Sequence, residues 1–515
     1  MKKKSSIMKS KLYTSFLFLS ATIFASLAMA QSPGMLWHNS YGGSTDEQFS
    51  CFDFTSDGGY VMGGYSTSSN GDVSQNQGNG DYWVVKADAA GNLIWERSYG
   101  GSADEWIRSI QQTSDDGYIV AGVTYSDDGD VSGYHDQSDA WILKLDPLGN
   151  IIWQRCLGGE LSEDPCGIVQ TTDGGYVVIS LSSSHTGDVS NPTMTSDYWM
   201  VKLDSAGNIS WDKSIDNGGS ADYPMAMKQT TDGGFIVAGS TNGFADNWIV
   251  KLDPLGNVEW DQVLGGSQDD TPRGVDQVID GGFVVAGSTQ SMDGDVQGFN
   301  GAIDFWVLKF DSAGNLLWTN ALGGSLSDYP SGICHTADGG CVIIGATNSS
   351  DGDVSSLPGL ASAWLVNLDA DGNLIDEVAL GGSYGEDGRA IRQMSNGEFI
   401  FVGTTMSTTG SFSGNQGGAD AWLVHLQPWI ITGIENDNDR LAVEVYPNPA
   451  IHRLNVVVES VCIGKKYMLL DAVGKIVMGG TVDSECIQLD LSHCAKGIYY
   501  IKVGSSVLAR KIIKL

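Results

Sequence analysis

Positive charge is scarce in this sequence. Its 515 residues include 28 lysines and arginines against 62 acids, which gives a formal net charge of −34. A protein surface with this balance repels the phosphates of nucleic acids and anionic lipids, whereas it favours divalent cations, basic partners or neutral glycans. The composition therefore argues against nucleic-acid binding.

Other features are also missing. After the N-terminal region, no segment reaches the roughly 20 apolar residues that a membrane-spanning helix needs. Helical periodicity is absent. The seven histidines are scattered, and neither a His-Glu-x-x-His motif nor a Gly-x-Ser-x-Gly motif occurs, so the common hydrolase signatures are lacking. Carboxylate pairs that suit glycoside hydrolysis are expected by chance among 62 acids, and no pair is singled out.

What the sequence does contain is an internal repeat marked by tryptophan. One tryptophan per copy recurs with spacings of 58, 58, 49, 58, 58 and 58 residues, at Trp83, Trp141, Trp199, Trp248, Trp306, Trp364 and Trp422. A second series is formed by Trp37, Trp95, Trp153, Trp211, Trp260 and Trp318. A period of this length is typical of one four-stranded blade of a β-propeller with its loops. We interpret both series as packing contacts between blades, because each indole can bury about 150–250 Å².

The second copy, residues 104 to 158, shows the strands of one repeat. Four β-rich runs, called a, b, c and d, are separated by turn signals such as Asp116-Gly117, which suits a tight hairpin. The c-to-d turn ends in Gly149-Asn150, and glycine recurs there because it adopts a positive φ without steric cost. The sequence therefore predicts an all-β fold.

The two ends of the array are complementary. The chain after the N-terminal region begins with a lone strand d at 35–43, and the seventh copy stops after its strand c at 421–426. Joining them completes a seventh blade and removes exposed sheet edges. We predict a seven-bladed β-propeller closed by the N-terminal strand over residues 31–428, then a linker at 429–442 and a small antiparallel β-sandwich domain at 443–515.

The first thirty residues have the pattern of a secretion signal. Five lysines precede an apolar stretch from Leu12 to Leu27, and Ala28-Met29-Ala30 supplies small residues for cleavage before Gln31. We predict a Sec-type signal peptide at 1–30; retention of the apolar stretch as an anchor is the alternative.

The last seventy or so residues break the repeat. They contain Tyr446-Pro447-Asn448-Pro449, then LNVVVE at 454–459, YMLLDAVGKIV at 467–477, KGIYYIKV at 496–503 and KIIKL at 511–515. With these blocks, residues 443–515 resemble the type A C-terminal sorting domain of the type IX secretion system, which is found on exported proteins of Bacteroidetes. The matching residues are Tyr446, Pro447, Asn448, Pro449, Gly474, Lys475, Gly497, Tyr499, Lys511 and Lys514.

The resemblance implies a domain that the outer-membrane export machinery recognises, and that is usually cleaved and replaced by attachment to a surface glycolipid. The expected location is extracellular or at the outer cell surface, and the expected partner is the type IX secretion machinery. An ordinary C-terminal β-domain used for binding is the alternative. The repeat array resembles propeller-like repeat proteins that Bacteroidetes join to this sorting domain, a likeness that carries little functional information.

Aspartates gather in the loops of one predicted face. In a propeller the b-to-c and d-to-a connections emerge on the same side, and nine aspartates lie in or near the b-to-c loops: Asp72, Asp130, Asp188, Asp295, Asp353, Asp81, Asp139, Asp197 and Asp304. Calcium takes six to eight oxygen ligands in irregular geometry, so these residues are candidate calcium ligands. The alternative is that each aspartate caps a turn through backbone hydrogen bonds.

Two classes of function remain. The first is an exported, non-catalytic surface propeller that binds a glycan or protein ligand through its acidic long-loop face. The alternative is a secreted glycan-active hydrolase or lyase on the same scaffold. Repeat fidelity favours the first, because the loops vary in length without acquiring an evident catalytic set. No catalytic residue is assigned. Disulfides are not required, although Cys334 and Cys341 flank one hairpin and are candidates to face each other.

Overall fold

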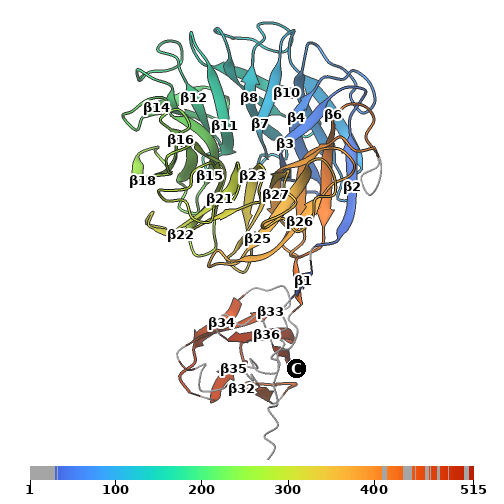
Figure 1. Cartoon of the computed structure of the whole chain (residues 1–515), viewed down its shortest axis with the longest axis vertical. Coiled ribbons are helices and arrows are strands. Elements are labelled where there is room, and N and C mark those ends of the chain that lie inside the picture. The colour runs from blue at the N-terminus through green and yellow to red at the C-terminus, as the bar shows by residue number, and fades with distance from the viewer. Residues whose placement is uncertain are drawn as a thin grey trace, which may run out of the picture. The chain divides into compact units, whose positions relative to one another are not determined.

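Strands, turns and loops make up the described part of the chain. The computed structural model (Figure 1) describes residues 29–31, 33–408, 414–432, 444–446, 448–458, 463, 465–471, 476–484, 486–503 and 510–514. None of these residues is helical, so none belongs to a helix that can cross a membrane. The chain divides into a unit of residues 31–430 and a unit that includes residues 431–515. Of the predicted signal peptide, only Met29 and Ala30 are among the described residues.

Residues 31–430 form seven four-stranded antiparallel sheets within the described ranges. Their strands are β3 (Glu47–Phe54), β4 (Tyr60–Ser66), β5 (Asp81–Ala87) and β6 (Leu93–Tyr99); β7 (Glu105–Gln112), β8 (Tyr118–Thr124), β9 (Asp139–Leu145) and β10 (Ile151–Leu157); β11 (Glu163–Gln170), β12 (Tyr176–Ser182), β13 (Asp197–Leu203) and β14 (Ile209–Ile215); β15 (Tyr223–Gln229), β16 (Phe235–Thr241), β17 (Asp246–Leu252) and β18 (Val258–Leu264); β19 (Asp270–Gln277), β20 (Phe283–Thr289), β21 (Asp304–Phe310) and β22 (Leu316–Leu322); β23 (Asp328–His335), β24 (Cys341–Thr347), β25 (Ser362–Leu368) and β26 (Leu374–Leu380); and β27 (Glu386–Gln393), β28 (Phe399–Thr405), β29 (Asp420–Leu426) and β2 (Met35–Tyr41). β1 (Met29–Gln31) pairs with β30 (Ile430–Thr432) in a further two-stranded sheet.

Six of the seven sheets are built from consecutive strands, and one joins the two ends of the array. In that sheet the order is β2-β29-β28-β27, with Trp37 opposite His425 and Ser40 opposite Trp422. The first strands of the seven sheets contact one another in the order β3, β7, β11, β15, β19, β23 and β27, and β27 contacts β3. These first strands lie around the centre of the unit in Figure 1.

The core lies between neighbouring sheets. Seven clusters of buried side chains each combine residues of two adjacent sheets, and one of them joins the sheet of β27–β29 to the sheet of β3–β6. The first tryptophan series lies in these clusters, on the third strand of each sheet, and its seven members are at most 2% exposed. The third strands are buried on both faces, since each sheet packs between two others. Each indole therefore serves as a sheet-to-sheet contact, as the repeat predicts.

The second tryptophan series packs on turns of the next sheet. Trp260 on β18 lies against Gly314, which is in the β21–β22 turn and has a φ of 84°. A Cβ atom placed on Gly314 would lie 2.6 Å from Cδ2 of Trp260. The glycine is thus needed twice, for its positive φ and for the close approach of the ring. Gly91, Gly149, Gly207, Gly256 and Gly372 repeat this contact or a close variant of it.

Cys334 and Cys341 do not face each other, which corrects the expectation from their positions. Cys334 is opposite Val342 and Cys341 is opposite His335, so the two cysteines are offset by one residue across the hairpin. Side chains alternate between the faces of a strand, and a one-residue offset therefore sends the two thiols to opposite faces. Cys334 packs in the cluster with Trp422, and Cys341 packs in the cluster with Trp364.

The unit that includes the C-terminal region contains two antiparallel sheets. One has β31 (Glu444–Tyr446), β32 (Arg453–Val457) and β35 (Cys486–Asp490), and the other has β34 (Ile476–Thr481), β33 (Lys466–Asp471), β36 (Gly497–Val503) and β37 (Arg510–Lys514). A single buried cluster combines Leu454 and Leu489 of the first sheet with Leu469 and Ile501 of the second. The two sheets therefore share a core.

Replacing Gly314 with alanine tests the indole contact. Gly281 in the same sheet is the matched control, because its φ is 85° but its added Cβ would meet nothing nearer than Cβ of Ser312 at 4.0 Å. Gly281→Ala should cost about 1 kcal/mol of unfolding free energy from backbone strain alone. Gly314→Ala should cost about 2–4 kcal/mol, since overpacking adds to the strain. Chemical denaturation measures both, and equal losses would contradict the contact.

Candidate functional site

Every first strand carries a β-bulge at the same position. In β7 the register to β8 shifts between Ile107 and Ser109, so that Arg108 is the extra residue. The same shift occurs in β3, β11, β15, β19, β23 and β27. A bulge leaves one residue unpaired and re-aims its side chain. The seven bulged residues are Ser50, Arg108, Cys166, Met225, Arg273, Ser331 and Arg389.

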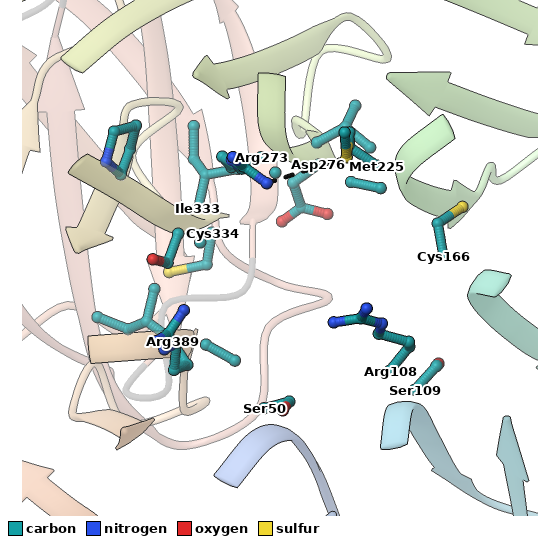
Figure 2. Close-up of a pocket in the computed structure, with 18 of the residues that line it drawn as sticks. Ser50, Arg108, Ser109, Cys166, Met225, Arg273, Asp276, Ile333, Cys334 and Arg389 are labelled. Atoms are coloured by element: carbon teal, nitrogen blue, oxygen red, sulfur yellow. Dashed lines mark hydrogen bonds between the residues drawn. The ribbon is translucent and has the colours of Figure 1, made fainter. Parts of the chain in front are cut away.

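The bulged side chains line one cavity. Its volume is about 840 Å³, and all seven bulged residues are part of its wall. This size falls within the roughly 300–1,000 Å³ of small-ligand pockets. Figure 2 shows Arg108, Arg273 and Arg389 on different strands around this cavity. We call it the central channel, because the first strands of the seven sheets supply its wall.

Two of the three bulged arginines have carboxylate partners. Arg108 donates two hydrogen bonds to Asp164, from Nε to Oδ1 at 3.1 Å and from Nη2 to Oδ2 at 2.9 Å. Burial opposes the charge of this guanidinium, but Asp164 raises the pKa of Arg108 overall. Arg389 Nη2 lies 2.8 Å from Oδ2 of Asp387. Both arginines are therefore held in position by a carboxylate.

Arg273 has no such partner within the described part of the chain. Its Nη1 donates a single weak hydrogen bond, to Sδ of Met225 at 3.9 Å, and the side chain is exposed to the channel. Burial lowers the pKa of Arg273, and the charges of Arg389 and Arg108 lower it further. The guanidinium is thus a set of donors directed into the cavity and free to receive an acceptor.

Aromatic side chains lie two residues before the bulge, nearer the start of the first strands. Trp106 and Tyr329 line the cavity and are 36% and 45% exposed. Trp106 contacts Tyr65, with ring centroids 6.4 Å apart, and Arg108 lies over its ring at 6.0 Å. The channel therefore combines flat apolar faces with guanidinium groups.

Charges are balanced farther along the first strands. Arg392 pairs with Asp53 at 2.5 Å, and Lys228 pairs with Asp276 at 3.0 Å. Asp276 Oδ2 also accepts hydrogen bonds from the backbone nitrogen of His335 at 3.0 Å and from its Nδ1 at 2.7 Å. Burial favours the neutral acid, but these partners lower the pKa of Asp276 overall. The unmatched positive charge of the channel thus lies at the bulged layer.

The channel wall offers nucleophile types without an activating base. Ser50, Ser109, Ser331 and Cys166 line it, but no histidine is among the described lining residues. Burial raises the pKa of the Cys166 thiol well above its usual value. A thiolate is the reactive form of cysteine, so this thiol is inert at neutral pH. No hydroxyl or thiol of the wall is paired with an imidazole in the manner of an acyl-transfer site.

The predicted metal ligands do not converge on one site. Among the loop aspartates, Asp72, Asp130, Asp295 and Asp353 each accept a backbone N–H of a glycine in the preceding d-to-a loop, at 3.1, 3.3, 3.2 and 3.1 Å. Asp188 instead pairs with Arg155 at 3.5 Å. These contacts join one sheet to the next through the loops. They give these aspartates a structural role between neighbouring sheets, which differs from the capping of their own turns.

The other four candidates, Asp81, Asp139, Asp197 and Asp304, begin third strands and are at most 2% exposed. Asp420 is equivalent to them and was missed, because its repeat lacks the loop motif. Burial raises the pKa of Asp81 and Asp304 to about 6 and that of Asp420 to about 7, and nearby acids add to the effect. Burial also raises the pKa of Asp139 and of Asp197.

Each of these buried acids faces a second carboxylate from the next sheet. Asp420 Oδ1 and Glu47 Oε2 lie 2.6 and 2.7 Å from the point where a Cβ on Gly42 would stand. That Oδ1 accepts no hydrogen bond within the described residues. At one boundary Asp216 adds a third acid, and Asp197, Asp216 and Asp222 are the one group of described residues whose ligand atoms lie within 4.8 Å of one another.

The predicted sorting residues lie mainly along the strands of the C-terminal region. Asn448 Oδ1 accepts the backbone N–H of Ile513 at 2.8 Å, and the buried Tyr499 donates its hydroxyl to the carbonyl of Ala495 at 2.8 Å. The others that the structure places are Tyr446 on β31, the exposed Pro449, Gly497 on β36, and Lys511 and Lys514 on β37. Pro447, Gly474 and Lys475 lie outside the described residues.

Comparison with known families identifies this region. Residues 444–515 match the family described as the secretion system C-terminal sorting domain. The chain carries a type IX secretion sorting domain. The resemblance drawn from its sequence blocks is confirmed, and the sorting domain implies export to the cell surface or outside the cell through the type IX machinery of Bacteroidetes.

Solved structures similar to this chain are β-propellers. The Pan2 WD40 domain of Neurospora crassa is 10% identical, with a TM-score of 0.44, and the alignment covers 74% of this chain and 89% of that one. Sqt1 of Chaetomium thermophilum is 10% identical, with a TM-score of 0.43 and coverage of 77% and 100%. PorZ of Porphyromonas gingivalis, a surface component of the type IX secretion system, is 11% identical, with a TM-score of 0.37. The alignment covers 92% of this chain and 60% of PorZ.

These identities and TM-scores carry no information on ligand or activity. Comparison with curated protein sequences returned no match. The chemistry of the site therefore has to be argued from its own residues.

Asp420→Asn tests the buried carboxylate pairs. Burial raises the pKa of Asp420 from its ordinary value of 3.8 to about 7 in the folded state. Between about pH 4 and pH 7 the unfolded chain therefore loses a proton that the folded chain retains, so folding becomes less favourable as the pH rises. We expect Asp420→Asn to match wild type near pH 4 and to have the higher melting temperature above pH 7. The equivalent residue of the sixth repeat, Ser362, is already uncharged.

Melting curves from pH 4 to pH 8, each with Ca²⁺ and with a chelator, provide the measurement. If Asp420→Asn were less stable than wild type at pH 8, the buried negative charge of Asp420 would not be destabilising, and this prediction would be wrong. A melting temperature that rises with Ca²⁺ in wild type but not in Asp420→Asn would instead favour the calcium interpretation.

Proposed function

We propose that this chain is an exported, non-catalytic surface protein whose seven sheets form a closed seven-bladed β-propeller, with β2 as the closing strand, and that it binds its ligand in the central channel. The sorting domain supports delivery by the type IX machinery. Residues 1–30 then act as the signal peptide, and residues 429–442 link the propeller to the sorting domain at 443–515.

The observation that carries the binding proposal is the contrast between the bulged position and the rest of the repeat. Positions that pack sheets together keep the same residue in nearly every copy, as the third-strand tryptophan does. The bulged position reads Ser, Arg, Cys, Met, Arg, Ser and Arg around the ring. Its side chains all line the cavity, and Cys166 also packs against a buried cluster between two sheets. A position that is structurally equivalent in all seven copies but holds four different residue types is free to serve a ligand.

The channel is a better candidate than the acidic loop face. Four of the five loop aspartates that suggested that face use a carboxylate oxygen to accept a backbone N–H of the neighbouring loop. Those carboxylates have a structural role without any ligand. The bulged arginine Arg273, in contrast, has donors with no strong acceptor in the described part of the chain.

A binding role fits the channel better than hydrolysis or elimination. The described wall residues include no histidine, and burial raises the pKa of the Cys166 thiol. The carboxylates of the wall, Asp276 and Asp387, are both engaged by cations. General acid and base catalysis needs a group with a pKa near the working pH, within reach of the substrate. These side chains do not supply one.

Removing the sorting domain tests export. A chain truncated after Asp439 retains the propeller repeats but lacks every residue of the family match. We expect it to remain inside the cell envelope, whereas the full chain reaches the exterior. Immunodetection in cell and medium fractions measures the difference. Continued release of the truncated chain would defeat the sorting role.

Filling the channel tests the site. Ser331→Trp places an indole at a bulged position of the channel wall, and Ser312→Trp adds the same side chain on an exposed turn outside it. On a glycan and protein array, we expect wild type and Ser312→Trp to bind the same spots, and Ser331→Trp to lose them. Binding that survives Ser331→Trp would locate the site elsewhere. A parallel turnover screen in which wild type cleaves a glycan would favour the hydrolase or lyase alternative.

A further inference from the structure

The channel has the opposite charge to the rest of the protein. The chain has nine arginines and a formal net charge of −34, yet four of those arginines line this one cavity. Five cations line it: Arg108, Arg273, Arg389, Arg392 and Lys228. Two acids of the described wall, Asp276 and Asp387, and two acids outside the wall, Asp53 and Asp164, pair with four of these cations, which leaves Arg273 without an acid partner among the described residues. Cations gathered at one place on an acidic protein need a local cause, because the net charge gives none.

Three arginines meet at the bulged layer without enough acids to balance them. Arg108 and Arg389 each have one aspartate, and Arg273 has none among the described residues. Ion pairing leaves the outer donors of a guanidinium available, since it has five N–H groups. Without a ligand, N–H donors of these guanidinium groups therefore lack acceptors. An anion placed between the guanidinium groups would accept hydrogen bonds from them and relieve their mutual repulsion.

The aromatic side chains beside the arginines indicate the rest of the ligand. Trp106 lines the channel and is 36% exposed, and its ring contacts those of Tyr65 and Tyr125, with centroids 6.4 and 6.1 Å apart. Tyr329 lies on another strand of the wall and is 45% exposed. Such rings present a flat apolar face and, in tyrosine, a hydroxyl. A sugar ring offers matching C–H faces and hydroxyl groups.

We infer that the channel binds an anionic polysaccharide, with a carboxylate or sulfate group held by Arg273 between Arg108 and Arg389, and with a sugar ring against Trp106. This inference rests on the proposed function and names the ligand class for the same site. Arginine suits the role because its planar fork binds carboxylate and sulfate oxygens in pairs. The acidic outer surface of the protein repels polyanions. Only the segment of the polysaccharide that enters the channel is therefore bound.

Calorimetric titration of the full-length chain with defined polymers tests the ligand class. Dextran and dextran sulfate differ only in sulfate, polygalacturonate supplies carboxylates on sugars, and polyglutamate supplies carboxylates without sugars. At about 0.15 M salt, long-range attraction is screened, and a protein of this net charge has no general affinity for polyanions. We expect dextran sulfate, polygalacturonate or both to bind, and dextran and polyglutamate to bind at least tenfold more weakly.

Variants assign that binding to the channel. Arg273→Gln should weaken it about 10- to 100-fold, since it removes charge-assisted hydrogen bonds, and Arg273→Lys should be intermediate. Arg97→Gln changes the net charge equally but lies on β6 outside the cavity, so its affinity should equal that of wild type. Arg273→Gln breaks no ion pair of the described chain, and its melting temperature should not fall.

The outcomes separate this inference from the proposed function. If dextran binds as well as dextran sulfate and Ser331→Trp abolishes both, the channel site stands and the anionic ligand is wrong. If polyglutamate binds as tightly as the polysaccharides, the saccharide is wrong. If the anionic polymers bind equally to wild type, Arg273→Gln and Ser331→Trp, both proposals fail. Failure of both anionic polysaccharides to bind wild type overturns the inference.

Discussion

Burial of an indole between neighbouring sheets is the interaction on which the rest of the repeat unit depends. The third strand of each sheet is covered on both faces, and its tryptophan is at most 2% exposed. Because each indole packs against residues of an adjacent sheet, no sheet has a complete core of its own. The strand-d indoles add a second contact at the turns, where a glycine such as Gly314 allows the ring to approach. The first strand of each sheet also contributes to these clusters, as Phe49 does by stacking on Trp83, while its bulged residue lines the channel.

The β-bulge in each first strand creates the channel site. In a regular first strand, successive side chains would point alternately toward the two neighbouring sheets. The side chain of the residue after Ile107 would then pack between sheets. The extra residue breaks the alternation and directs Arg108 into the cavity, with the same result in all seven sheets. The scaffold thus offers seven equivalent positions whose side chains line the cavity. Substitution at them is tolerated by the fold, which explains how one copy holds serine and the next holds arginine.

The sequence predicted the parts of this protein that repeat and missed the part that does not. Tryptophan spacing and turn glycines indicate strands and sheet contacts because these residues recur from one repeat to the next. A bulge changes neither the period nor the hydrophobic pattern, so Arg273 and its equivalents gave no signal as a group. Alignment of the seven copies could have revealed them, since the bulged residue of the first strand is polar in most copies and varies among four residue types. The aspartates of the acidic loops gave a clear sequence signal, but Asp130 and its equivalents join neighbouring loops. The error at Cys334 has a similar origin, because a register offset of one residue is set by the turn and not by the pattern.

Two kinds of unbalanced charge are buried in this unit, and they differ in what relieves them. At the sheet boundaries, burial raises the pKa of Asp420, and the charge of nearby Glu47 adds to the effect, so that uptake of one proton removes the charge of Asp420. The proton comes from the solvent, so the buried carboxylate charge is removed without a partner molecule. In the channel, Arg273 has no such route, because an arginine keeps its charge at any pH at which the protein is folded. An unpaired guanidinium beside two others lowers stability in the free protein, and selection for stability alone would remove it. Its presence in a chain with so few cations is therefore best explained by an anion that enters from outside.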